Sequence, residues 1–313
     1  MHTDRVSHIG VCPDLGCQEV RIAGVLPVRV VPMPSFRYVV VDVFTDRPLA
    51  GNQLAVFTDA RRIPEELLQP LAKEMAFSET VFVYPPEQGG NVRIRIFTPA
   101  SELPFAGHPI LGTAFVLAAP LQLGVIALET GSGIVPVELE HDESGRIVFG
   151  WMTQPVPTVE PFVQADELLT ALRVERSELP VEVYDNGARH VYVALADEAA
   201  VAALAPDLAA LAQLSVLGAN CFAGAGTRWK TRMFAPAAGV AEDPATGSAA
   251  GPLACHLARH GRIAWGEQIE ISQGAEIGRP STLFATAHGG DGLIDRVEVG
   301  GSAVVVARGE FRL

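Results

Sequence analysis

Hydrophobic positions recur along the chain with two periods, which predict short strands and amphipathic helices. Segment 65–77 has apolar residues at helical spacing and two glutamates in its first turn, where the helix dipole favours anions. A second helix is expected to begin at His108 and Pro109 and to run toward Ala119, because proline suits the first helical position. The strands predicted in this part of the chain cover residues 38–44, 54–57, 92–97, 128–139 and 146–151.

The same succession of elements returns 232 − 95 = 137 residues later. Residues 95–100 (RIFTPA) recur as residues 232–237 (RMFAPA), with four identities in six positions. The same offset lays strand 54–57 on 191–194 and helical segment 65–77 on 202–214. A period this long is not that of a solenoid, whose units run about 20–50 residues. It predicts two copies of one α+β domain.

The repeat also pairs residues that carry chemistry. At the same offset Ser78 aligns with Ser215 and Glu79 aligns with Val216. When three additional residues are allowed in the second copy, Gly107 aligns with Gly247 and His108 aligns with Ser248. Glu79 and His108 therefore have no acidic or basic counterpart in the other copy, which suits a reaction that transfers a proton at one face of a substrate.

Length and charge limit the function classes. The chain has 313 residues, enough for two domains, with prolines at 155 and 157 marking the expected linker and residues 1–35 lying outside the repeat. Its formal charge of −13 argues against general binding to nucleic acid or to an anionic membrane. We find no signal peptide and no apolar stretch of membrane-spanning length, so we expect a cytoplasmic protein.

Several common site motifs are absent from the sequence. It contains no GxGxxG after the first strand, no GxSxG and no phosphate loop ending in Gly-Lys-Ser/Thr. The cysteines are too few and too scattered for a disulfide framework or a paired zinc site: Cys12, Cys17, Cys221 and Cys255. His256 and His260 have a spacing that can bind zinc, but no third ligand is evident. A solvated or capping histidine pair, and no metal, is the expectation.

The glycines at 107 and 247 each stand at a turn that enters a helix. Unpaired N–H groups and a partial positive charge at a helix start bind carboxylate or phosphate, so two facing starts can share one anion. The alternative is two ordinary helices capped by serine or threonine side chains. For Glu79, a closed apolar cleft would raise the pKa toward neutrality and allow general acid–base work; the alternative is a solvated carboxylate. Arg279 suits either a ligand carboxylate or a brace between domains.

These residues stand in motifs that resemble the phenazine-biosynthesis PhzF-like isomerase family. Among them are Ser78-Glu79-Thr80, Gly107-His108-Pro109 and the aspartate motif that begins at Asp243. The resemblance runs in order from about residue 37 to the end of the chain, through residues 41–45, 49–52, 77–80, 104–109, 242–249, 272–274, 278–281 and 299–304.

The resemblance implies a diaminopimelate-epimerase-like α+β fold of two pseudo-symmetric domains, each a curled β-sheet around a central helix. It predicts a first domain of residues 36–155 plus 303–313, a second of 156–302, and an N-terminal extension of 1–35 outside the fold. It implies a homodimer and a cofactor-independent isomerase that moves a proton on a small carboxylate-bearing substrate. The naming member of the family isomerises trans-2,3-dihydro-3-hydroxyanthranilate.

The resemblance also assigns roles to residues. Glu79, His108 and Asp243 are expected to be catalytic, with Gly107, Gly247, Ser248 and Asn52 binding the substrate. Two alternatives remain open: an amino-acid racemase or epimerase without the thiol pair of related enzymes, and a non-catalytic protein that binds small anions. The helix starts at 107 and 247 have no adjacent cysteine, which disfavours a two-thiol mechanism.

Overall fold

The computed structural model describes residues 10–11, 18–20, 28–30, 34–290 and 292–313. Three short strands of the N-terminal extension, β1 (Gly10–Val11), β2 (Gln18–Val20) and β3 (Val28–Val30), pair with one another in a separate sheet. Cys12 and Cys17 lie outside the described residues. Among the described residues, no helix has the length and apolar character needed to cross a membrane.

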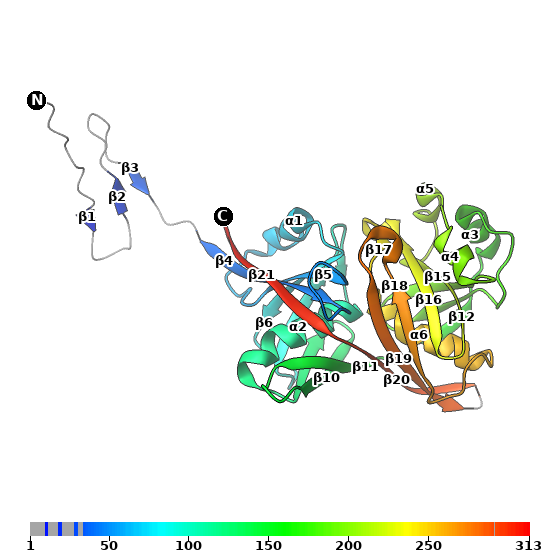
Figure 1. The fold of residues 1–313 in the computed structure, drawn as a ribbon. Coiled ribbons are helices and arrows are strands. Elements are labelled where there is room, and N and C mark those ends of the chain that lie inside the picture. Colours follow the sequence, from blue (N-terminus) through cyan, green and yellow to red (C-terminus); the bar gives the residue numbers. More distant parts are fainter. Residues whose placement is uncertain (1–9, 12–17, 21–27, 31–33, 291) are drawn as a thin grey trace, which may run out of the picture.

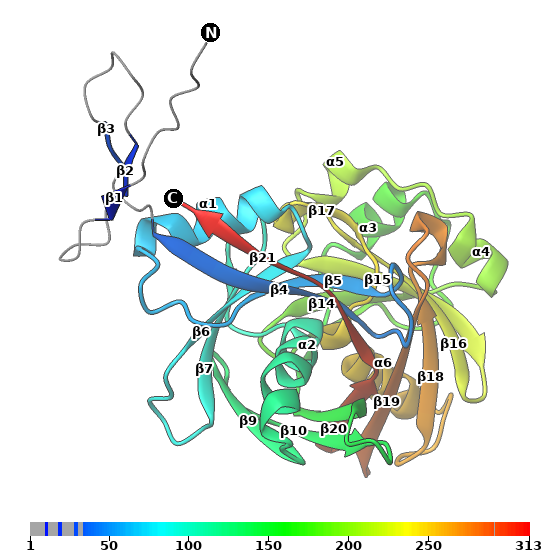
Figure 2. The same cartoon turned by 60° about the vertical axis from the view of Figure 1, so that its left-hand side comes forward.

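The first half of the molecule is built from strands around one long helix (Figures 1 and 2). Its helices are α1 (Glu65–Met75) and α2 (Gly107–Ala118), followed by a 3₁₀ turn at Ala119–Leu121. Its strands are β4 (Ser35–Val43), β5 (Asn52–Phe57), β6 (Glu79–Tyr84), β7 (Val92–Phe97), β8 (Glu102–Leu103), β9 (Val125–Thr130), β10 (Gly133–His141), β11 (Ile147–Gln154) and β21 (Ala303–Arg312).

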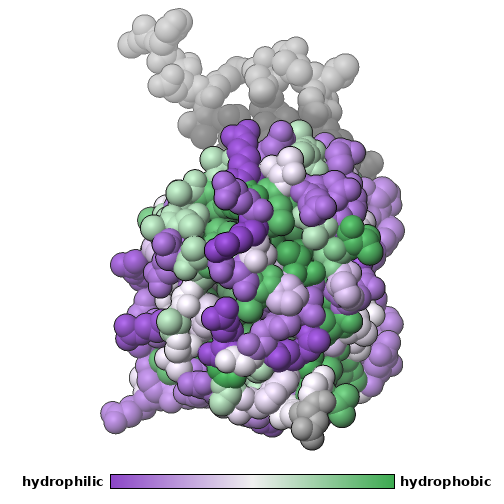
Figure 3. Space-filling view, turned by 90° about the vertical axis from the view of Figure 1, so that its right-hand side faces the viewer, coloured by the Kyte–Doolittle hydropathy of each residue, from purple (hydrophilic) through white to green (hydrophobic). Residues whose placement is uncertain are grey.

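The second half repeats this plan. Its helices are α3 (Ala165–Leu172), α4 (Glu198–Ala202), α5 (Leu208–Leu211) and α6 (Gly247–Arg259), with 3₁₀ turns at Pro236–Ala238 and Ala275–Ile277. Its strands are β12 (Thr158–Pro161), β13 (Glu182–Asp185), β14 (Arg189–Ala194), β15 (Gly218–Ala225), β16 (Arg228–Ala235), β17 (Val240–Asp243), β18 (Gln268–Gln273), β19 (Ser281–Gly290) and β20 (Leu293–Gly301). The face of the molecule on the right-hand side of Figure 1, where the second half lies, mixes hydrophilic and hydrophobic residues (Figure 3).

Strand pairing shows that the two halves have the same topology. The first half is paired in the order β21-β4-β5-β6-β7-β9-β10-β11 and the second in the order β12-β13-β14-β15-β16-β18-β19-β20. In both, the third and fourth strands are parallel, as are the fifth and sixth, and the other neighbours are antiparallel. The last strands of the two orders, β11 and β20, pair with each other and join the halves. The pseudo-symmetry predicted from the repeat is therefore present.

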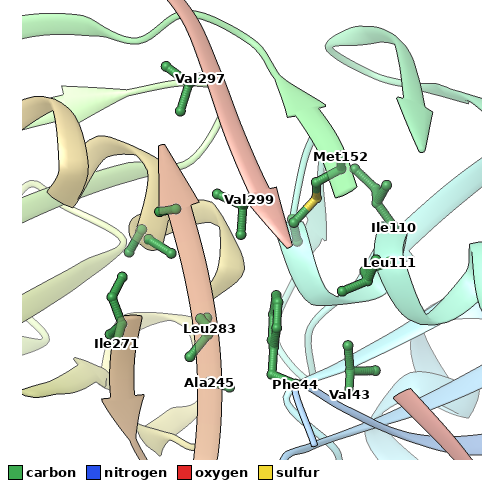
Figure 4. Close-up of a cluster of buried hydrophobic side chains, with 14 of the residues drawn as sticks. Val43, Phe44, Ile110, Leu111, Met152, Ala245, Ile271, Leu283, Val297 and Val299 are labelled. Carbon is green, nitrogen blue, oxygen red and sulfur yellow. The ribbon is translucent and has the colours of Figure 1, made fainter. Parts of the chain in front are cut away.

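Each half wraps its sheet around one helix that is buried along nearly its whole length. Helix α2 contacts β4, β5, β9 and β11, and helix α6 contacts β18, β19 and β20. Between them lies a continuous apolar core in which the Phe44 ring stands between residues of both halves (Figure 4). The core residues labelled there are Val43, Phe44, Ile110, Leu111, Met152, Ala245, Ile271, Leu283, Val297 and Val299.

Three sequence predictions need correction. Segment 128–139 is a hairpin rather than one strand, because the turn at Gly131 and Ser132 separates β9 from β10. Segment 202–214 is not one helix, because a non-helical stretch containing Pro206 separates α4 from α5. Glu79 also has a different counterpart from Val216. The pairs Thr80–Phe97 and Ala219–Phe234 match it to Gly218, and the pairs Leu54–Glu79 and Val191–Ala219 match it to Ala219.

Candidate active site

The N-termini of α2 and α6 meet where the two halves face each other. A Cβ atom placed on Gly107 would lie 2.4 Å from the carbonyl carbon of Gly247 and 2.5 Å from the amide nitrogen of Ser248. Such distances are shorter than any real contact of a Cβ atom, so this approach requires glycine at position 107. The structure thus brings the two predicted helix starts into direct contact.

Neither helix start is capped by a side chain. The residues that precede α2 and α6, Ala106 and Thr246, make no side-chain capping hydrogen bond. The Thr246 hydroxyl instead donates to Oδ2 of Asp243 at 2.5 Å. The alternative of two ordinary side-chain-capped helices is therefore wrong, and the first amides of both helices can serve an anion.

Glu79 begins β6 and points its carboxyl group toward His108. Glu79 Oε2 and His108 Nε2 are 3.3 Å apart, but the two atoms are not aligned as a hydrogen bond. Only 13% of the Glu79 side chain is exposed, so it is not a solvated strand-end carboxylate. Burial, together with the negative charge of Asp243, raises the pKa of Glu79 well above 4.5.

His108 is neutral in this surrounding. Burial lowers the pKa of its imidazole to about 3. The amide nitrogen of Asn52 lies 3.2 Å from His108 Nδ1, and a hydrogen bond with the backbone of Gln53 opposes the fall in the pKa.

Asp243 receives hydrogen bonds, whereas Oε2 of Glu79 has no hydrogen-bond partner in the described part of the chain. Besides Thr246, Asn52 Nδ2 donates to its Oδ1 at 2.8 Å. Burial raises the pKa of Asp243, whereas the hydrogen bonds from Thr246, Ser78 and Asn52 oppose that rise. Two buried carboxyl groups thus share one site in unequal surroundings, a pattern that separates an acid from a base.

Asn52 stands at the centre of this network. Its Nδ2 contacts His108 Nδ1, Asp243 Oδ1 and, at 2.9 Å, the carbonyl oxygen of Ala245. Its Oδ1 accepts a hydrogen bond from the Ser78 hydroxyl at 3.1 Å. The side chain is fully buried, so in this structure its polar atoms hold other residues of the site in place.

A small cavity joins these groups. It is lined by Glu79, Asp243, Ser248 and Thr246, together with His190 and apolar side chains that include Leu103, Leu217 and Met233. Its free volume is about 30 Å³, enough for about one water molecule, so a larger ligand has to move the walls apart. A polar end beside an apolar end suits a small ring that carries a charged group.

Residues missed from the sequence complete the site. Gln273 Nε2 donates to the carbonyl oxygen of Asp243, and Gln154 Nε2 donates to that of Gly247, both at 2.8 Å. His190 Nε2 lies 3.0 Å from the hydroxyl oxygen of Ser248. Gln273 lies in segment 272–274 of the resemblance, but no role was assigned to it. Gln154 and His190 lie in no motif, and only the folded chain reveals their partners.

Arg279 braces the two halves. Its guanidinium donates to Oδ1 of the buried Asp42 at 2.6 Å and to the carbonyl oxygens of Ala50 and Gly51 at 2.8 and 2.9 Å. Of the two roles considered, the structure shows the brace, which fixes the turn that leads into Asn52.

The pair His256 and His260 has a different surrounding from the one expected. His256 is fully buried, so the prediction of a solvated pair is wrong for this residue. Glu182, from β13, brings its Oε2 to 3.1 Å from His256 Nδ1 and 2.9 Å from His260 Nε2. The guanidinium of Arg259 donates to the same oxygen at 2.9 Å. Because this cation already neutralises the carboxylate, the group forms an ion-pair cluster at the end of α6.

Fold and site together define a class of protein in which two related halves meet at a buried cluster of titratable side chains. The family model described as "Phenazine biosynthesis-like protein" matches residues 41–309. The chain is 53% identical over 277 residues to trans-2,3-dihydro-3-hydroxyanthranilate isomerase of Pseudomonas aeruginosa. The alignment covers 88% of this chain and 99% of that protein. This chain belongs to the phenazine biosynthesis-like family, and the prediction of a PhzF-like isomerase is confirmed.

Solved structures confirm the fold. The PhzF-family phenazine biosynthesis protein of Bacillus anthracis superposes with a TM-score of 0.76 at 25% identity, covering 90% of this chain and all of that one. A hydroxyproline epimerase from Agrobacterium vitis has a TM-score of 0.64 at 12% identity, covering 89% of this chain and 93% of that one, and so shares the fold. The predicted diaminopimelate-epimerase-like α+β fold is therefore correct.

Proposed function

We propose that this chain isomerises trans-2,3-dihydro-3-hydroxyanthranilate by moving a proton with Glu79. The observation that carries the proposal is the buried carboxyl group of Glu79, 3.3 Å from a neutral histidine and beside two uncapped helix starts. Three relatives from Pseudomonas species, each identical to this chain at about half of the aligned residues, are named for this reaction.

The substrate and the product of this isomerisation have the same atoms, so only one proton and the double bonds change position. In its ionised form Glu79 takes the proton from the ring carbon that bears the hydroxyl group. The electron pair shifts through the diene, and Glu79 returns the proton to a carbon at the other end. The enol that results becomes a ketone. A carboxyl group with a raised pKa suits both steps, because it accepts and donates protons near neutral pH.

The other residues of the site bind and orient. The amides at the start of α2 and α6, at Gly107, Gly247 and Ser248, are placed to hold the substrate carboxylate. His108 and Asp243 orient the ring and assist protonation, and Asn52 takes part in binding by fixing both of them. The substrate fills the small cavity and so displaces water from around the reactive intermediate.

The test is turnover of the proposed substrate. We expect the absorbance of the diene to disappear when the wild-type protein is added, with a product of unchanged mass. An unchanged spectrum would refute this reaction and return attention to other small carboxylates. Deuterium entering the α-carbon of an amino acid from heavy water, with racemisation, would instead support the racemase alternative.

We further propose a cytoplasmic homodimer, on the resemblance to the family alone. Light scattering after size-exclusion chromatography should give twice the mass of one chain. A mass of one chain at the concentration used for the activity assay would contradict this.

A further inference from the structure

The β13–β14 hairpin holds the first turn of α6 at three points. Asn186 Nδ2 donates to the carbonyl oxygen of Ser248 at 3.0 Å, and the Tyr192 hydroxyl donates to that of Ala249 at 2.9 Å. Between them, His190 Nε2 lies 3.0 Å from the Ser248 hydroxyl oxygen. The first two contacts fix the backbone, whereas the third acts on the Ser248 side chain, beside the amide that the proposed function assigns to the substrate carboxylate.

His190 stands in the wall of the reaction cavity and is almost completely buried, with 2% of its surface exposed. Among the described residues, its Nδ1 has no hydrogen-bond partner. A buried N–H group without a partner is rarer than an unpaired acceptor, so Nδ1 carries the lone pair and Nε2 carries the proton. Burial also lowers the pKa of His190 to about 4, against the charge of Asp185, so the ring is neutral.

This tautomer sets the direction of the Ser248 hydroxyl. With the His190 Nε2 proton donated to it, the hydroxyl oxygen acts as an acceptor there, and its own hydrogen remains for another partner. We propose that His190 is a positioning residue that makes Ser248 a hydrogen-bond donor to the substrate carboxylate. The inference rests on the proposed function and extends it, because it adds the Ser248 hydroxyl to the backbone amides that bind the carboxylate.

The test is a double-mutant cycle on positions 190 and 248. Calorimetry measures the binding of anthranilate, an aromatic carboxylate with no diene to isomerise, and steady-state kinetics measure turnover of the substrate. We expect His190→Leu to weaken binding and to raise KM about tenfold, the effect of losing one hydrogen bond to a charged group, with little change in kcat. His190→Gln, whose longer amide reaches Ser248, should recover most of the binding. In a Ser248→Ala background, His190→Leu should have no further effect.

The outcomes separate the two claims. If Ser248→Ala binds anthranilate like the wild type, the Ser248 hydroxyl does not donate to the carboxylate and the role of His190 is refuted, whereas the proposed function is refuted separately, by an unchanged diene spectrum with the wild type. If Ser248→Ala weakens binding but His190→Leu adds its full effect to it, only the role of His190 is refuted. Circular dichroism melting checks that each variant is folded. If His190→Leu does not fold, His190→Asn, whose side chain is too short to reach Ser248, takes its place in the cycle.

Discussion

At the scale of single residues, the site depends on the unequal surroundings of two carboxyl groups. Asp243 accepts hydrogen bonds from Thr246 and Asn52, whereas, among the residues that the structure describes, Oε2 of Glu79 has only the misaligned contact with His108. Hydrogen bonds favour the charged form of a carboxyl group, and burial without them favours the neutral form. Asp243 is therefore the group that holds its charge, and Glu79 is the one that gains and loses a proton.

This difference predicts a pH dependence. Glu79 must be ionised in the free enzyme to accept the proton, so kcat/KM should fall as the pH drops through its raised pKa, which lies above the ordinary carboxyl value of 4.5. Asp243→Asn removes a charge that raises this pKa and should move the acidic limb of the residual activity to lower pH. The measurement is kcat/KM of both proteins from about pH 4 to pH 8. A wild-type limb at the ordinary carboxyl pKa would contradict the account.

Sequence reasoning brought the central residues together but not their supports. Glu79, His108 and Asp243 stand in motifs. In the structure Glu79 and Asp243 line the cavity, and His108 lies next to Glu79. Asn52 was assigned to the substrate, yet its amide contacts residues of the site, because the β4–β5 turn buries it between the two halves. His190 was missed because its partner, Ser248, lies far along the chain.

At the scale of elements, the site depends on two helices that begin against each other. The glycines at 107 and 247 allow a backbone contact that any side chain would prevent. Their positions were predictable, since a glycine before a helix is visible in the sequence and the repeat aligns the two. Helical segment 202–214 was not predictable in the same way, because the fixed offset took no account of Pro206.

Gly107→Ala tests this contact. The added methyl group would overlap the backbone of Gly247 and Ser248, so the two helix starts must separate. We expect a lower melting temperature and a loss of kcat/KM of at least about 100-fold, as for a misplaced catalytic group. Gly124→Ala is the matched control, because a Cβ atom there meets nothing within 4 Å. Equal activity and stability of the two variants would show that the contact is dispensable.

At the scale of the whole molecule, the two halves share the largest apolar core, and each also has a smaller apolar cluster of its own. One apolar core runs from residues of β4 and α2 to residues of α6, β19 and β20, and the β11–β20 pair joins the sheets. The sequence predicted two domains from the repeat, but a repeat does not reveal whether the copies share a core. That depends on residues such as Phe44, which contacts both halves.

The shared core predicts cooperative unfolding. We expect urea to unfold both halves in one transition, because exposing either half would expose the core of the other. The fluorescence of Trp151, Trp229 and Trp265 reports on both halves and should change together with far-UV circular dichroism. Two separate transitions would indicate that each half is stable by itself.

The most direct test of the central claim is turnover of trans-2,3-dihydro-3-hydroxyanthranilate by the wild type, Glu79→Gln and Glu74→Gln. Glutamine keeps the shape of Glu79 but cannot carry the proton, and Glu74 is an exposed glutamate on α1 that serves as the matched control. We predict that Glu74→Gln removes the diene absorbance at the wild-type rate and that Glu79→Gln is slower by about 1,000-fold or more. Turnover by Glu79→Gln within a few-fold of the wild type would contradict the account.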